Sequence, residues 1–275
     1  MVTFSIIGDL HYSIGESESE EMMELKNRFF QHFLTEFFSL QSDFHVSIGD
    51  LTHHGKREEI QSIYAKINHL SASFQHVLGN HDLYELTKDE IVQLTGKPRY
   101  HAYSCSEGRV IRLDSTREKR PDNWSGVIDN EQFYWLKQEI DSHQNEPLII
   151  FSHHPLYNTT TRSSEFNGSI IKEDPIHELL QNHKPGGYFF CGHCHTHSIC
   201  REDNWCYIQT AAVYDHPVIR TVSIKNRTLK TTLHEIDDIE LKNNAKKIHD
   251  SLYEKNTPFD PYGHFTDRSR KLVLI

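Results

Sequence analysis

The chain has 275 residues, of which 25% are charged, and its formal net charge is −10 at pH 7. This length is sufficient for one large α/β domain with a sizeable core, and the negative charge disfavours nucleic acid and anionic lipid as partners. The apolar runs fall well short of the ~20 residues that a membrane span requires, so no membrane role is expected.

Short runs rich in Val, Ile, Phe and Leu predict strands, and apolar residues at helical spacing predict helices between them. In chain order, the predicted elements are strand Val2 to Ile7, helix Met22 to Phe38, strand Phe44 to Ile48, helix Lys56 to Leu70, strand Phe74 to Leu78, strand Arg109 to Leu113, helix Asp129 to Ile140 with Asp129 as its cap, and strands Leu148 to Phe151 and Tyr188 to Phe190. Beyond Gly192, strand-like pieces follow one another across short polar turns, at Trp205 to Ala212, Val218 to Ile224 and Thr228 to Glu235.

Near-continuous apolar strands are typical of sheets that are covered on both faces. The last three strand-like pieces predict a second, more antiparallel sheet. We therefore expect an α/β fold, a four-layer α/β/β/α sandwich with two mixed β-sheets flanked by helices. One domain is expected over residues 1–250, followed by an irregular C-terminal tail over 251–275 that lies on the surface.

The N-terminus and the cysteines favour a cytoplasmic location. Residues 1–7 lack the basic start of a signal peptide and run directly into Gly8-Asp9. The five cysteines are an odd number in a chain that can build a good core, which suits a reducing compartment better than a disulfide framework. The oligomeric state stays open.

Metal-ligand residues recur directly after predicted strands, as Asp9 and His11, Asp50, Asn80 and His81, His153, and His193 with His195. In open α/β sheets, the loops at the carboxyl ends of strands converge on one crevice, so these five endings predict one site. Oxygen and imidazole ligands suit a pair of divalent ions, and the Asp50 carboxylate could bridge two cations ~3.5–4 Å apart. The pattern predicts a two-metal hydrolase.

In order, these residues stand in Gly8-Asp9-Leu10-His11, Gly49-Asp50 followed by Gly55, Gly79-Asn80-His81-Asp82, His153-His154-Pro155 and Gly192-His193-Cys194-His195. The ordered set resembles the calcineurin-like metallophosphoesterase family, and Gly-Asn-His-Asp is a fairly specific part of it. The resemblance implies the metallophosphoesterase fold. It also implies one metal ion held by Asp9, His11, Asp50 and His195, and a second held by Asp50, Asn80, His153 and His193.

The resemblance further implies the chemistry of the site. His81 would carry no metal but would face the substrate and stabilise the transition state or protonate the leaving oxygen, with Asp82 orienting its imidazole. A metal-bound hydroxide would attack phosphorus in line, without a covalent enzyme intermediate. Substrate contacts would come from Asn80 and His81, and the two divalent ions would be manganese, iron or zinc. Apart from the resemblance, Arg162 in the loop Asn158 to Gly168 could pair with a phosphate, although an arginine on a polar loop is usually only solvated.

The stretch from Arg109 to Leu136, with Leu113-Asp114-Ser115 and Gly126, is similar to the class III branch of cyclic-nucleotide and glycerophosphodiester phosphodiesterases. This implies a small phosphodiester as substrate. A phosphomonoesterase on the same site is the alternative enzyme, because this family supports several chemistries on one metal site. A non-catalytic scaffold is disfavoured, since every ligand position is filled.

Other histidines and cysteines leave room for different interpretations. Cys191, Cys194, Cys200 and Cys206 could form a structural zinc module with nearby histidines, although that would leave Asp9 and Asp50 unexplained. We expect His154 to pack behind the site and His53 and His54 to be exposed to solvent. The roles of Cys194 and His197, which depart from the commoner family pattern, stay open.

Overall fold

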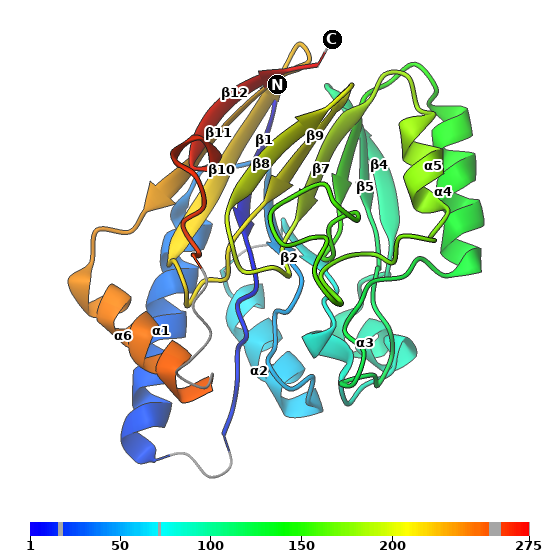
Figure 1. The fold of residues 1–275 in the computed structure, drawn as a ribbon. Helices are drawn as coiled ribbons and strands as arrows, with labels where there is room; N and C mark the ends of the chain where they lie inside the picture. The colour runs from blue at the N-terminus through cyan, green and yellow to red at the C-terminus, as the bar shows by residue number, and fades with distance from the viewer. Residues whose placement is uncertain (16–18, 71–72, 253–259, 275) are drawn as a thin grey trace.

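The computed structural model describes residues 1–15, 19–70, 73–252 and 260–274. Within these residues, two six-stranded sheets pack face to face and helices lie outside them, as Figure 1 shows. Among the described helices, none is both long and apolar enough to cross a membrane.

The first sheet has the strand order β12-β11-β10-β1-β2-β3. One half of this sheet is parallel and consists of β1 (Val2–Ile7), β2 (Phe44–Ile48) and β3 (Phe74–Val77). Three antiparallel strands complete it, β10 (Val218–Lys225), β11 (Thr228–Glu235) and β12 (Ser269–Val273). Its outer face carries α1 (Glu20–Ser39), α2 (Arg57–Asn68) and α6 (Ile239–Leu252), and α3 (Lys88–Thr95) lies beside α2.

The second sheet has the strand order β4-β5-β6-β7-β9-β8. Four parallel strands form its centre, β5 (Gly108–Arg112), β6 (Leu148–Phe151), β7 (Gly187–Cys191) and β9 (Trp205–Gln209). The antiparallel strands β4 (His101–Cys105) and β8 (Ser198–Glu202) close its two edges. Its outer face carries α4 (Asn130–Ser142) and α5 (Ile176–Gln181).

Three apolar layers hold the sandwich together. Between the sheets, the ring of Phe151 lies 5.2 Å from Phe4 and 5.0 Å from Phe190, measured between ring centroids. Outside the first sheet, the predicted apolar stripe of α1 is buried, including Phe29 and Phe33. Burial on both faces of the sheets is what the apolar strands predicted, and the four-layer α/β/β/α architecture is confirmed.

The prediction that the strands after Gly192 form a second, more antiparallel sheet was wrong. They form no separate sheet, because β9 pairs in parallel with β7 whereas β10 pairs antiparallel with β1. The hairpin of β10 and β11 thereby covers the edge of β1 that would otherwise expose unpaired backbone groups. The sequence pattern also missed β4, β8, α3, α5 and α6, which are short or only weakly periodic.

The C-terminal tail is more ordered than predicted. Helix α6 continues to Leu252, residues 253–259 lie outside the described residues, and β12 pairs with β11. The buried guanidinium of Arg220 helps to anchor this segment, since its Nη2 donates a hydrogen bond to the carbonyl of Asp267 at 3.1 Å. Strand β12 has five residues, of which Leu272 is buried. This alternation of apolar and polar side chains is too short to predict a paired strand from the sequence.

Candidate metal centre

The seven predicted metal-ligand side chains meet where strands β1, β2, β3, β6 and β7 end. Close approaches between imidazole, carboxylate and amide atoms connect Asp9, His11, Asp50, Asn80, His153, His193 and His195. Both sheets contribute, because β1, β2 and β3 belong to the first and β6 and β7 to the second. The convergence of strand ends that the sequence predicted is therefore present.

One half of the cluster is built around His153 and His193. Nδ1 of His153 lies 2.8 Å from the carbonyl oxygen of Ile48, and Nε2 of His193 lies 2.9 Å from that of Asn167. A carbonyl oxygen can only accept, so both of these ring nitrogens carry hydrogen. The remaining nitrogens, Nε2 of His153 and Nδ1 of His193, face each other at 3.2 Å. In the neutral rings, two lone pairs point into the same space, which suits a cation.

The other half is built around His11 and His195, whose Nε2 atoms are 3.2 Å apart. Oδ1 of Asp9 lies 3.6 Å from Nε2 of His195. The outer nitrogen of His195, Nδ1, is 3.0 Å from Oδ2 of Asp215, and the outer nitrogen of His11 is 3.4 Å from Nδ1 of His53. Asp9, His11 and His195 thus have ligand atoms close enough together to hold one ion.

Asp50 and Asn80 present oxygens to the imidazoles. Oδ1 of Asp50 accepts a hydrogen bond from the backbone N–H of His81, which leaves Oδ2 at 3.3 Å from Nε2 of His153 and 3.9 Å from Nε2 of His11. The amide nitrogen of Asn80 donates to the hydroxyl of Tyr84, so its carbonyl oxygen is the atom that lies 3.0 Å from His153. Asp50 Oδ2 is therefore shared between the two halves.

The backbone at the site adopts conformations that side-chain-bearing residues usually avoid. Positive φ angles occur at Asp9 (20°), His11 (49°), Asp50 (47°), His193 (68°) and His195 (54°). Such residues each cost about 1–3 kcal/mol and cluster at functional sites, where surrounding contacts hold them. Gly49 also has a positive φ, 92°, and a Cβ there would lie 2.3 Å from Nδ1 of His153.

Burial and mutual contacts shift the protonation of the cluster in both directions. Burial lowers the pKa of His193 to about 3. It also lowers the pKa of His153, but Asp50 and Asp9 outweigh it and raise that pKa to about 9. Burial raises the pKa of the Asp50 carboxyl, yet His153 and His81 hold it well below its ordinary value. Metal ions would have to displace protons from this cluster, so its metal affinity depends on pH.

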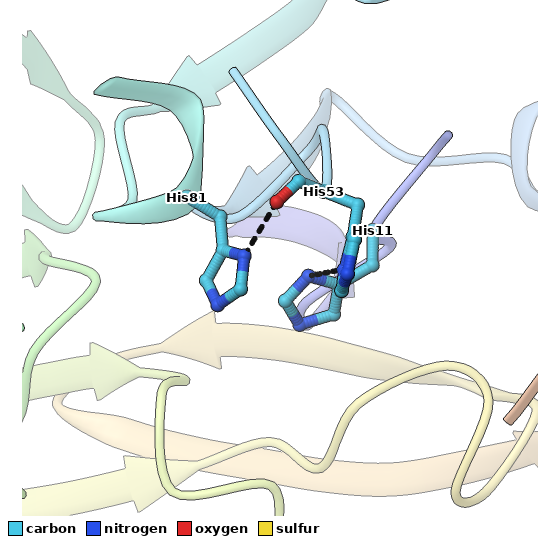
Figure 2. A group of neighbouring side chains, drawn as sticks. All are labelled: His11, His53 and His81. Carbon is cyan, nitrogen blue, oxygen red and sulfur yellow. Dashed lines mark hydrogen bonds between the residues drawn. The ribbon is translucent and has the colours of Figure 1, made fainter. Parts of the chain in front are cut away.

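His81 lies at the start of a single 3-10 turn (His81–Leu83), beside His11 and His53, as Figure 2 shows. Its Nδ1 donates to the backbone carbonyl of His53 at 2.6 Å. The prediction that His53 is exposed was wrong: the residue is half-buried, and its ring lies 5.3 Å from His11 and 5.2 Å from His81 between centroids. Its neighbour His54 is exposed as predicted and pairs with Glu59. Residues 53 and 54 lie in a loop, where no periodicity of apolar residues indicates which side chain is buried. The sequence therefore could not show which of these two histidines is exposed.

The predicted contact between Asp82 and the His81 ring is not among the hydrogen bonds of the described residues. The Asp82 carboxylate accepts hydrogen bonds from the backbone N–H groups of Thr52 and Gly79, at 2.8 and 2.9 Å, and from the Thr52 hydroxyl at 2.9 Å. Asp82 is fully buried and ties the loop after β2 to the loop after β3. It therefore positions the segments that carry Asp50 and Asn80.

A cavity of about 350 Å³ opens over the cluster. Its wall includes Asp50, Asn80, His81, Tyr84, Pro121, Trp124, Arg162, Glu165, Phe166, Gly168, His193, Cys194 and His195. Arg162 is held at this wall, because its Nε donates to Glu165 and its Nη1 to the carbonyl of Cys194. The predicted substrate contact from Arg162 is thus sterically available.

His154 and the cysteines form their hydrogen bonds with groups other than the seven predicted ligands. Nδ1 of His154 is 2.8 Å from Ser115 Oγ and Nε2 is 2.9 Å from the carbonyl of Trp124, which agrees with the predicted packed role. Within the described residues, the groups that could hold a metal contain only His and Asp. Burial raises the pKa of the Cys194 thiol to about 12, and its Sγ lies 3.2 Å from the carbonyl oxygen of Gly168. These observations speak against the zinc module.

Two groups that matter to the site escaped the sequence analysis. Asp215 lies in the turn between β9 and β10, and its Oδ1 is 2.7 Å from Nδ1 of His249 on α6. Burial raises the pKa of the Asp215 carboxyl, but the bonds from His195 and His249 outweigh it and lower that pKa. Asp215 follows the predicted strand Trp205 to Ala212 by three residues, but only the folded chain places it beside His195.

The sequence model of the calcineurin-like phosphoesterases matches residues 2–197. The chain belongs to this family. It is similar to a probable glycerophosphodiester phosphodiesterase from Arcobacter nitrofigilis, at 25% identity over 180 residues that cover 64% of each chain. It is also similar to a probable cyclic nucleotide phosphodiesterase from Moraxella catarrhalis, at 24% identity, covering 70% of this chain and 72% of that protein. The alignment therefore spans slightly less than two thirds of the Arcobacter protein.

Solved structures support the fold of this family member. A dimetal phosphatase from Danio rerio superposes with a TM-score of 0.69 at 16% identity, covering 85% of this chain and 96% of that one. A purple acid phosphatase from yellow lupin superposes with a TM-score of 0.54 at 12% identity, covering 85% of this chain and 51% of that one. At these identities the likeness establishes a shared architecture.

Proposed function

We propose that this phosphoesterase family member hydrolyses small phosphodiesters at a centre of two divalent metal ions. One observation carries the proposal: four imidazoles direct one nitrogen inward and have the other engaged by an outer partner. Those outer partners are the Ile48 and Asn167 carbonyls, the Asp215 carboxylate and the His53 ring. Metal-ligating histidines are held in this way, whereas both ring nitrogens of the packed His154 are engaged, by Ser115 Oγ and the Trp124 carbonyl.

The two halves of the cluster match two ligand sets. Asp9, His11 and His195 would hold one ion, and Asn80, His153 and His193 the other. Asp50 would serve both ions, since its Oδ2 lies 3.3 Å from His153 of one half and 3.9 Å from His11 of the other. When bound, the ions would acidify a water molecule and neutralise charge on the phosphoryl oxygens.

The chain's own residues would then handle orientation and the leaving group. The Nδ1–H of His81 is engaged by the His53 carbonyl, which leaves Nε2 free to face the cavity that His81 lines. In its protonated form, this imidazole can donate to the leaving oxygen. Arg162, fixed by Glu165 and the Cys194 carbonyl, can contact a phosphoryl oxygen.

Charge at the cavity wall favours a diester over a monoester. Among the described residues of this wall, Arg162 is the one Lys or Arg side chain, and Glu165 is paired with it. A diester carries one negative charge, whereas a monoester approaches two and needs more positive charge beside it. The names of the two phosphodiesterase relatives point the same way.

The test compares bis(p-nitrophenyl) phosphate with p-nitrophenyl phosphate. The protein is stripped with a chelator and reloaded with manganese, iron or zinc in separate samples. We expect activity only after reloading, about two ions per chain by elemental analysis, and a higher kcat/KM for the diester. Faster turnover of the monoester would support a phosphomonoesterase, and a fully loaded protein that hydrolyses neither compound would support a non-catalytic scaffold.

A further inference from the structure

The cavity over the candidate metal centre has two exposed aromatic side chains in its wall. Trp124 is 39% exposed and Phe166 is 83% exposed, and both line the cavity that Asp50 and His81 also line. Their ring centroids are 6.1 Å apart and their planes meet at 86°, so the two rings form an open corner. Exposed apolar groups beside a polar cavity mark a contact for a ligand.

This aromatic corner, Trp124 and Phe166, is attached through backbone carbonyls to the candidate ligand His193 and to the packed His154 behind it. The carbonyl of Trp124 accepts a hydrogen bond from Nε2 of His154 at 2.9 Å. The carbonyl of Asn167, next to Phe166, accepts one from Nε2 of His193 at 2.9 Å. The two loops that carry the rings are therefore held in position by the same histidine layer that surrounds the reacting centre.

The shape of the corner selects for a flat, apolar group. A planar heterocycle can stack on one ring and meet the other at its edge, and stacking on aromatic side chains works for every nucleobase because each has a π-face. A glycerol or ethanolamine group is small and polar and could cover neither ring. Arg162 in the same wall offers a cation for the phosphate, so base and phosphate would have separate contacts.

From this geometry, and resting on the proposed diesterase function, we propose that Trp124 and Phe166 bind the base of a nucleotide diester. The preferred substrate class is then a cyclic nucleotide, not a glycerophosphodiester. Trp124 and Phe166 act as specificity-determining residues of the site.

The experiment compares the wild type with Trp124→Ala and Phe166→Ala on 3′,5′-cyclic AMP and on glycerophosphoethanolamine. Phe265→Ala is the matched control, since Phe265 is 81% exposed and is not part of the cavity wall. We expect kcat/KM for cyclic AMP to fall roughly 10-fold or more in both variants, mainly through KM, because each variant loses a ring on which the base stacks. Turnover of glycerophosphoethanolamine should change less than about twofold, and Phe265→Ala should match the wild type on both substrates.

Binding provides a readout that does not require turnover. AMP added to the metal-loaded protein should quench tryptophan fluorescence in the wild type and in Phe265→Ala, and the quench should be lost in Trp124→Ala. Equal losses on both substrates, or an unchanged quench in Trp124→Ala, would overturn the aromatic corner as a base site. A loaded wild type that hydrolyses no diester but retains the Trp124-dependent quench would refute the proposed diesterase function while supporting the base site.

Discussion

Asp50 accepts a hydrogen bond from the backbone N–H of His81 through Oδ1, at 2.8 Å. Its second oxygen, Oδ2, is left to face His153 at 3.3 Å and His11 at 3.9 Å. The two oxygens of one carboxylate thus have different tasks, one in holding the loop after β3 and one in facing the candidate metal ions.

This division predicts the behaviour of Asp50→Asn. An asparagine can retain the bond to His81 through its carbonyl oxygen and tolerates the positive φ of 47°, but it places an NH₂ group where Oδ2 stood. We expect a folded protein that binds no metal. The wild type should gain about 2.7 kcal/mol of stability at a metal concentration 100 times Kd, and the variant none, as measured by thermal unfolding with and without metal. A variant that retains two ions would contradict the bridging role.

Asp215 is predicted to strengthen the metal site from outside it. Its carboxylate lies between His195 and His249, and both of these partners are positioned by the fold, not by sequence proximity. Asp215→Asn should weaken metal affinity about 10–100-fold, the usual cost of removing the partner of a ligating histidine. A chelator competition on the folded protein measures this.

His249→Gln serves as the graded control for Asp215. It removes only the distant partner, so its loss of metal affinity should be smaller than that of Asp215→Asn. Both residues lie beyond the segment 2–197 that matches the family model, so the support would come from this chain's C-terminal part. Equal affinity in the wild type and in Asp215→Asn would exclude the role.

Asp82 is predicted to act on stability and His81 on catalysis. Asp82→Asn replaces an acceptor of several buried N–H and O–H groups with a partial donor, so the free energy of unfolding should fall by about 2 kcal/mol or more. The metal-loaded, folded fraction should keep kcat within a few-fold. His81→Asn should instead lower kcat about 10²–10⁴-fold at nearly unchanged stability. Denaturant titration and single-substrate kinetics on both variants decide the assignment, and the reverse pattern would restore Asp82 as a catalytic residue.

Gly49 and Gly96 provide a matched pair with positive φ angles. A Cβ at Gly49 would lie 2.3 Å from Nδ1 of His153, whereas a Cβ at Gly96 would meet nothing within 4 Å. Gly96→Ala should cost about 1–2 kcal/mol of stability through backbone strain and leave activity intact. Gly49→Ala should in addition displace His153 and abolish metal binding, which elemental analysis would show. Metal retention in Gly49→Ala would mean that the loop can shift without moving His153.

The sequence alone could predict the layers and the place of the site. Strands such as Phe44–Ile48 and Leu148–Phe151 were predicted with the bounds that the structure has, because a run of buried apolar residues identifies itself locally. The candidate ligands follow such strands, and parallel strands bring their carboxyl ends together in any such fold. For this reason Asp9, Asp50 and His153 could be grouped without coordinates.

Only the tertiary structure decided which atoms the side chains of the site contact. Asp82 stands next to His81 in sequence but binds the loops around Thr52 and Gly79, and His53 faces the site while His54 faces solvent. Asp215, Trp124 and Phe166 reach the site through contacts with residues far away in the chain. Apolar periodicity records which face of an element is buried, whereas a hydrogen-bond partner depends on where separate loops come to rest after packing, and that information lies in no local stretch of the chain.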